Sequence, residues 1–234
     1  TLVLLLSILA GCGGGPAQPP HDPSPESTAK PGVPQFRYNV TDLGTLGGKS
    51  SSATAINNKG QVVGDADTTT NETHAFLWEA GKGMQDLGTL GGKASKARGI
   101  NDAGQVVGRS DTVANPSTWP RSHHAFLWEA GSGLRRLGAL GGHVSIATAI
   151  NNKGQVVGYA DTGSGEQHAF LWQAGSGMKD LGTVHGRFSE ATAINDHAQV
   201  VGYVYDGPRG SEVRHAFLWE AGSGLRRLGA LGGH

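Results

Sequence analysis

Ala147 to Gly182 reads ATAINNKGQVVGYADTGSGEQHAFLWQAGSGMKDLG. Four short runs stand out in this stretch: ATAIN, QVVGYAD, HAFLW and MKDLG. They are rich in alanine, valine, threonine and aromatic residues, which favour strands, and no run has the length and period of a helix. The stretch therefore predicts four β-strands.

The segments between these runs carry turn signals. Asn151-Asn152-Lys153-Gly154 joins the first two runs, with an asparagine suited to open a type I turn and a glycine suited to the left-handed position that follows. Gln173-Ala174-Gly175-Ser176-Gly177 joins the last two runs in the same manner. The whole unit can therefore form one four-stranded antiparallel sheet.

The unit is repeated along the chain. The pentapeptide HAFLW begins at four histidines, His74, His124, His168 and His215. The leucine of a second marker, the LG pair, keeps the same register at Leu43, Leu87, Leu137, Leu181 and Leu228. Residues 124–143 recur without change at residues 215–234. A period of about 44 to 50 residues with four strands matches one blade of a β-propeller.

The apolar residues in QVVGYA and HAFLW are consecutive, so each sheet has to be covered on both faces. Stacking of sheets around an axis achieves this, and we expect an all-β protein, a β-propeller of four-stranded antiparallel blades; a β-solenoid-like repeat array is the alternative. The visible part is expected to be truncated, with four complete repeats preceded by one N-terminal strand, YNVTDLG. Since the last copy has its own fourth strand, we expect at least five blades in the intact protein.

The N-terminus predicts export and a lipid anchor. Residues 1–12 form an uncharged apolar run that ends in Leu9-Ala10-Gly11-Cys12, which resembles the lipobox of bacterial lipoproteins. Cys12 is the expected lipidation site and the only cysteine. Residues 13–35 are rich in proline, glycine and serine and are expected to be a disordered linker, and residues 36–234 form the repeat domain. We expect a lipoprotein of the bacterial cell envelope, attached to the outer membrane or cell surface.

Three motifs, HAFLWEAG, DLGTLGG and AINNKGQVVG, recur in this order and resemble the HAF repeat, a family of probable extracellular repeats. The resemblance covers roughly residues 38–234 and implies export, but no settled biochemical activity. The chain departs from the pattern where Arg136 and Arg227 replace the aspartate of DLG, where Val184-His185 interrupts GTLGG, and where Ala198 replaces the turn glycine.

The histidines of HAFLW are candidates for a metal or catalytic site, but we favour a structural role. Metal ligands have to converge on one point, whereas these histidines are spread one per copy. We expect a hydrogen bond from each histidine to an aspartate across the preceding loop, at Asp67, Asp111 and Asp161 for the first three copies. The recurring asparagines Asn57, Asn101, Asn151 and Asn195 are expected to form turns, because the carboxylates beside them are too few for calcium. No metal and no cofactor is expected.

The connection before each HAFLW run differs in length between copies, so the insertions gather on one rim. We expect this rim to be the recognition surface, with four candidate contact residues: Trp119, Arg121, Tyr205 and Arg209. Lys+Arg and Asp+Glu both number 19, which argues against nucleic acid as a partner. The sequence favours a binding scaffold for a glycan or protein ligand over an enzyme, since no catalytic motif occurs. A glycan-active enzyme with catalytic residues outside this chain, and a purely structural surface array, are the alternatives.

Overall fold

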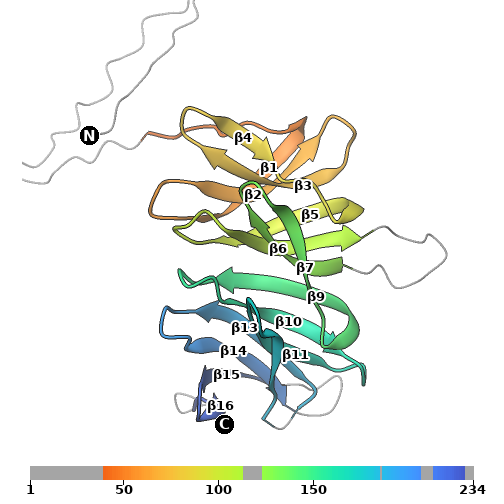
Figure 1. The fold of residues 1–234 in the computed structure, drawn as a ribbon, viewed down its shortest axis with the longest axis vertical. Helices are drawn as coiled ribbons and strands as arrows, with labels where there is room; N and C mark the ends of the chain where they lie inside the picture. The colour runs from red at the N-terminus through yellow and green to blue at the C-terminus, as the bar shows by residue number, and fades with distance from the viewer. Residues whose placement is uncertain (1–38, 113–122, 185, 207–212, 230–234) are drawn as a thin grey trace, which may run out of the picture. The chain divides into compact units, whose positions relative to one another are not determined.

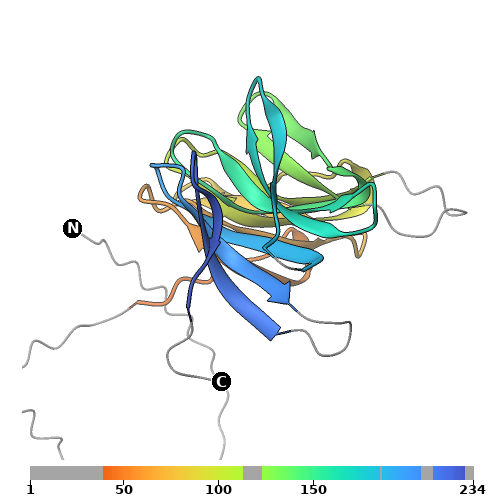
Figure 2. The same ribbon diagram turned by 90° about the horizontal axis from the view of Figure 1, so that it is seen from below.

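The structure of the chain is a computed structural model that describes residues 39–112, 123–184, 186–206 and 213–229. The chain divides into two compact units, Thr1–Asp42 and Leu43–His234, and every strand belongs to the second. Sixteen strands and no helix occur in the described ranges (Figure 1). The same strands and connecting turns are seen from below in Figure 2. The expected all-β class is confirmed.

Each copy of the repeat forms a quartet of consecutive strands. The first quartet has β1 (Gly47–Ile56), β2 (Val62–Thr68), β3 (Thr73–Glu79) and β4 (Gly83–Asp86). The second has β5 (Gly91–Ile100), β6 (Val106–Thr112), β7 (His123–Glu129) and β8 (Gly133–Gly138). The third has β9 (Gly141–Ile150), β10 (Val156–Thr162), β11 (Gln167–Gln173) and β12 (Gly177–Gly182). The fourth has β13 (Phe188–Ile194), β14 (Val200–Asp206), β15 (Val213–Glu220) and β16 (Gly224–Arg227).

All strand pairs within a quartet are antiparallel, as the hairpin signals predict. A single parallel residue pair, Thr73 with Ala94, links the first quartet to the second, and Gln167 with Phe188 links the third to the fourth. The quartets therefore form two eight-stranded sheets. The segment expected as an N-terminal strand is not one, because residues 39–45 lie outside any strand.

The turn between the first two strands has the expected geometry. In the third copy the amide of Gly154 donates to the carbonyl of Asn151 over 3.1 Å, and Gly154 has a φ of 74°. Ala198 takes the same place in the fourth copy with a φ of 60°. Such an angle is unfavourable for a residue with a Cβ, so the departure noted in the sequence introduces strain.

The core consists of three clusters, and each cluster lies between two successive quartets. Between the second and third quartets, for example, Val107 and Leu127 pack against Phe170 and Trp172. Equivalent residues fill the other two interfaces. Cations of the fourth strands add to this packing, since Lys179 lies 5.0 Å above the ring of Trp219. The expectation that each sheet buries both faces against its neighbours is therefore confirmed for these interfaces.

Candidate functional site

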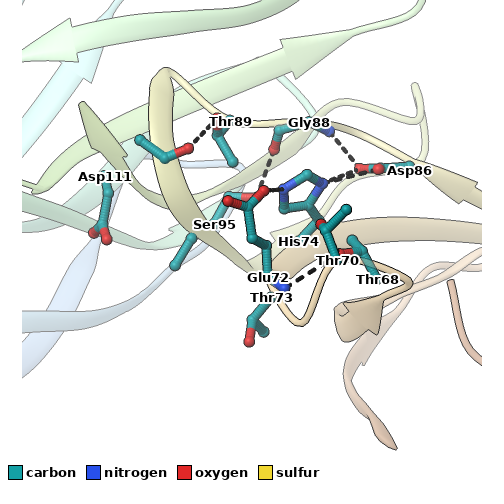
Figure 3. Close-up of polar contacts among 12 residues, drawn as sticks. Thr68, Thr70, Glu72, Thr73, His74, Asp86, Gly88, Thr89, Ser95 and Asp111 are labelled. Atoms are coloured by element: carbon teal, nitrogen blue, oxygen red, sulfur yellow. Dashed lines mark hydrogen bonds and ion pairs between the residues drawn. The ribbon is translucent and has the colours of Figure 1, made fainter. Parts of the chain in front are cut away.

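The histidines of the first and third copies bind an aspartate, but not the one that the sequence suggested. His74 Nδ1 lies 2.8 Å from Asp86 Oδ2, and Asp86 also accepts a hydrogen bond of 2.7 Å from the amide of Gly88 (Figure 3). The third copy repeats this geometry, with His168 Nδ1 2.8 Å from Asp180 Oδ2. The prediction that pairs these histidines with Asp67 and Asp161 is wrong, because the partner is the aspartate of DLG in β4 or β12.

Asp67 instead connects strands of its own quartet. Its carboxylate accepts hydrogen bonds from Ser50 over 2.6 Å and from Thr73 over 3.2 Å. The hydrogen bond from Ser50 lowers the pKa of Asp67. The equivalent Asp161 faces a more buried environment, and burial raises its pKa. Register explains the difference from the prediction, since Asp67 is opposite Thr73 and not opposite His74.

The second and fourth copies lack the aspartate of DLG, so their histidines have other surroundings. His124 is buried, and its Nδ1 has no hydrogen-bond partner among the described residues. Burial and the nearby Arg136 lower the pKa of His124 to about 4. In the fourth copy Arg227 donates to Asp206 over 2.8 Å, and Asp206 lies 3.9 Å from His215 Nε2. Replacement of the DLG aspartate by Arg136 thus leaves His124 without the carboxylate that His74 and His168 contact.

The recurring asparagines connect one quartet to the next. Asn57 Nδ2 donates to the carbonyl of Asn101 over 3.0 Å, Asn101 to that of Asn151 over 3.0 Å, and Asn151 to that of Asn195 over 2.9 Å. Their Oδ1 atoms accept amide hydrogen bonds within their own turns, as a turn role predicts. Together with the neighbouring isoleucines, these turns line a shallow hollow of about 340 Å³. The link between quartets is not visible in the sequence.

Buried serines form a second repeated link. Ser95 Oγ accepts a hydrogen bond of 2.8 Å from the amide of Ala75 in the preceding quartet. It donates one to the carbonyl of Gly88 (Figure 3). Ser145 and Ser189 make the same two hydrogen bonds in the following quartets. Serine and asparagine therefore supply a hydrogen-bonded frame that is uniform along the array.

Against this uniform frame, one pair of facing residues differs in every copy. The pair joins the first strand of each quartet to the second: Ser52 with Asp65, Lys96 with Arg109, Ile146 with Tyr159, and Glu190 with Tyr203. The frame accepts a carboxylate, a guanidinium or a phenol at the same second-strand position. These residues are therefore not dictated by the fold.

In the second quartet this pair lines a pocket of about 210 Å³. The walls come from β5, β6 and β7: Ala94, Ser95, Lys96, Arg109, Asp111 and His123. Arg109 Nε is buried and has no hydrogen-bond partner among the described residues. Lys96 Nζ lies 3.1 Å from Asp65 Oδ2 of the first quartet. Burial lowers the pKa of His123, and the positive charge of Arg109 lowers it further.

Lys96 also lines a wider hollow of about 400 Å³. It is lined by all four first strands together with Asp65 of β2, and its charged residues are Asp65, Lys96, Arg98 and Glu190. Every one of these charges occupies a position where the copies differ. Both hollows therefore combine a repeated backbone with side chains that are individual to one copy.

Of the four rim residues expected to contact a ligand, only Tyr205 lies within the residues that the structure describes. Trp119, Arg121 and Arg209 lie outside the described residues, as does Cys12. Tyr205 lies at the end of β14, where its ring meets that of Tyr203 edge to face with centroids 5.5 Å apart. Asp111 and His123, which line the smaller pocket, are close in sequence to the two ends of the segment that contains Trp119.

Comparisons with known proteins identify no family. No family model matches the chain, and no curated protein matches it. Among solved structures, the chain is similar to AofleA from Arthrobotrys oligospora, with 14% sequence identity and a TM-score of 0.42. The match covers 77% of this chain and 57% of that one.

Two further observations concern only the residues that the structure describes. Within them, no cluster of three or more histidine, cysteine, aspartate or glutamate side chains is arranged to hold a metal ion. The same residues include no helix that is long and apolar enough to cross a membrane.

Proposed function

We propose that the chain is a lipid-anchored binding scaffold of the bacterial cell envelope, built as a β-propeller of HAF-type repeats and without catalytic activity of its own. The observation that carries this proposal is the contrast between the repeated hydrogen-bonded frame and the facing residue pair that varies within it. Asparagine and serine links are the same from quartet to quartet, whereas the facing pair on the first two strands differs in every copy. A purely structural array has no need of such individual residues beside hollows.

The packing of the strands supports a propeller over a solenoid. Neighbouring first strands, β1 with β5, β5 with β9 and β9 with β13, contact one another much more closely than neighbouring fourth strands do. Sheets that are close along one edge and spread along the other fan out around an axis. The first strands therefore lie nearest the axis of the proposed propeller.

The last quartet has one face that resembles a blade interface without its neighbour. Val201 is 40% exposed, while the equivalent Val63, Val107 and Val157 are fully buried against the next quartet. Burial of a valine stabilises a protein by about 1.5 kcal/mol or more, so this face favours contact with another apolar sheet. A ring in which a further quartet covers Val201 would bury this face in the same way as the other three interfaces.

The expected lipobox at Cys12 and the rim residue Trp119 complete the proposal. Two acyl chains suffice for stable attachment to a membrane, and residues 13–35 would separate the folded array from it. An aromatic side chain outside the repeat pattern suits contact with a sugar or a protein surface. We assign Trp119 and the individual side chains of the second quartet to the ligand.

Binding of the lipidated full-length chain to an array of envelope glycans tests the proposal. We expect saturable binding that weakens in Trp119→Ala, while Trp78→Phe, a conservative change within a strand, serves as the matched control. Loss of membrane association in Cys12→Ser tests the anchor separately. Absence of binding to glycans and to envelope proteins would support a structural array, and turnover of a glycan would show an enzyme.

A further inference from the structure

The pocket formed by β5, β6 and β7 has an unusual arrangement of charge. The basic side chains of Lys96 and Arg109 and the imidazole of His123 line it, and Asp111 is the one carboxylate among its described lining residues. Lys96 already contacts Asp65. Arg109 Nε is shielded from water and has no hydrogen-bond partner among the described residues.

A buried donor without an acceptor is unfavourable, because the N–H group loses its hydrogen bond to water and gains none in return. The fold does not require this cost. At the same register the other copies carry Asp65, Tyr159 and Tyr203, and all three fit the same backbone. Arginine therefore occurs at this register only in the second copy. Binding of an external acceptor explains its presence better than packing does.

The chemistry of the walls defines the acceptor. A guanidinium presents N–H groups in a planar fork that matches the two oxygens of a carboxylate or of a phosphate. The Lys96 ammonium, on the residue opposite Arg109, adds a second positive charge, and the His123 imidazole, on the residue opposite Asp111, can donate a hydrogen bond. A volume of about 210 Å³ admits such a group but not a whole oligosaccharide.

We propose that this pocket binds the oxyanion group, carboxylate or phosphate, of an acidic ligand. The inference rests on the proposed binding function and assigns a ligand class to one of its hollows. Arg109 is the principal contact of the oxyanion. Lys96 adds a second positive charge, and His123 supplies a further hydrogen-bond donor. Asp111 restricts the pocket to ligands that place their anionic oxygens toward Arg109, since a negative charge on its own side is repelled.

Calorimetric titration of the full-length chain at low salt, with sulfate, inorganic phosphate and glucuronate as separate probes, tests the proposal. We expect saturable binding of at least one probe, and the comparison distinguishes a phosphate from a carboxylate ligand. Arg109→Tyr introduces the residue that two other copies carry at this position, so the fold is retained. It should weaken binding by about tenfold or more, the loss typical of a charge-assisted hydrogen bond.

Two matched variants make the test specific. Lys153→Gln removes one positive charge from an exposed turn and should leave binding unchanged. Lys96→Ser, which introduces the residue of the first copy, should weaken binding less than Arg109→Tyr because Asp65 already neutralises part of the lysine charge. Equal affinity of the wild type and Arg109→Tyr, or equal losses in Arg109→Tyr and Lys153→Gln, would overturn the proposal.

A spectroscopic readout reports on the pocket itself. Burial lowers the pKa of His123, Arg109 and Arg98 lower it further, and Asp111 and Asp161 oppose them. A bound sulfate, whose own charge is constant near neutral pH, should raise the pKa of His123 in an NMR titration, and the NMR signals of His197 in the fourth quartet should not change on addition of sulfate. Binding without any change at His123 would place the anion elsewhere. Failure of all three anions, with glycan-array binding intact, would refute the pocket but not the scaffold function.

Discussion

The asparagine links between quartets can be tested with a single substitution, Asn151→Ala. Asn151 is 4% exposed. Its Nδ2 donates to Gln155 Oε1 over 2.7 Å and to the carbonyl of Asn195 over 2.9 Å, and its Oδ1 accepts from the amides of Lys153 and Gln155. Alanine removes all four hydrogen bonds of this buried side chain.

At about 1 kcal/mol for each hydrogen bond, Asn151→Ala should lower the free energy of unfolding by about 4 kcal/mol. Asn195→Ala is the internal comparison. Asn195 makes the same bonds within its own turn, to the amides of His197 and Gln199 and to the Gln199 side chain, but it is exposed and has no link to a following quartet among the described residues. Because water can replace its bonds, this variant should lose only about 1 kcal/mol.

Urea unfolding followed by tryptophan fluorescence measures both losses in the same background. The expected difference of about 3 kcal/mol reports the contribution of the link between quartets and of burial. If the two variants lose equal stability, the hydrogen bond from one quartet to the next contributes nothing measurable, and the frame proposed for the array is incorrect.

Four further substitutions test the local geometry and charge. Gly158→Ala should destabilise the chain by about 3 kcal/mol or more, because its Cβ would approach the backbone of the neighbouring strand too closely, whereas Gly163→Ala, with open space, should be nearly neutral; thermal unfolding distinguishes them. Ala198→Gly should raise stability by about 0.5 kcal/mol in urea unfolding by relieving a φ of 60°, and a loss of stability would show that the strain is absent. Arg136→Asp should supply His124 with a carboxylate and raise its pKa. In the wild type the pKa of His124 is lowered to about 4 from 6.5, so the unfolded chain binds more protons between these values and stability falls as the pH decreases through them. The variant should lose less stability between about pH 7 and pH 5, and an unchanged pH dependence would contradict the assignment.

Because the same sequence unit is repeated along the chain, most of the fold could be predicted. The repeated runs predicted the strands, and glycine at position 154 predicted the left-handed turn that the structure shows. The consecutive apolar residues of HAFLW predicted sheets covered on both faces, and the three core clusters confirm it. These features depend on local propensity and alternation, which a single sequence displays directly.

Partners across strands were less predictable. The sequence predicted a hydrogen bond from His74 to an aspartate and indicated Asp67. The structure shows that the partner is Asp86. Both aspartates are within reach along the chain, and only the exact register decides between them. A shift of one residue moves a strand side chain to the opposite face of the sheet.

The sequence by itself determined the repeat, the all-β class and the positions at which the copies differ. Only the tertiary structure decided what those differences do. It placed Lys96, Arg109 and His123, which come from three strands, around one pocket. It also gave three of the four recurring asparagines an acceptor 44 or 50 residues further along the chain: Asn57, Asn101 and Asn151. Such contacts arise from the stacking of whole sheets, and their energy depends on distance and burial, quantities that spacing along a chain does not contain.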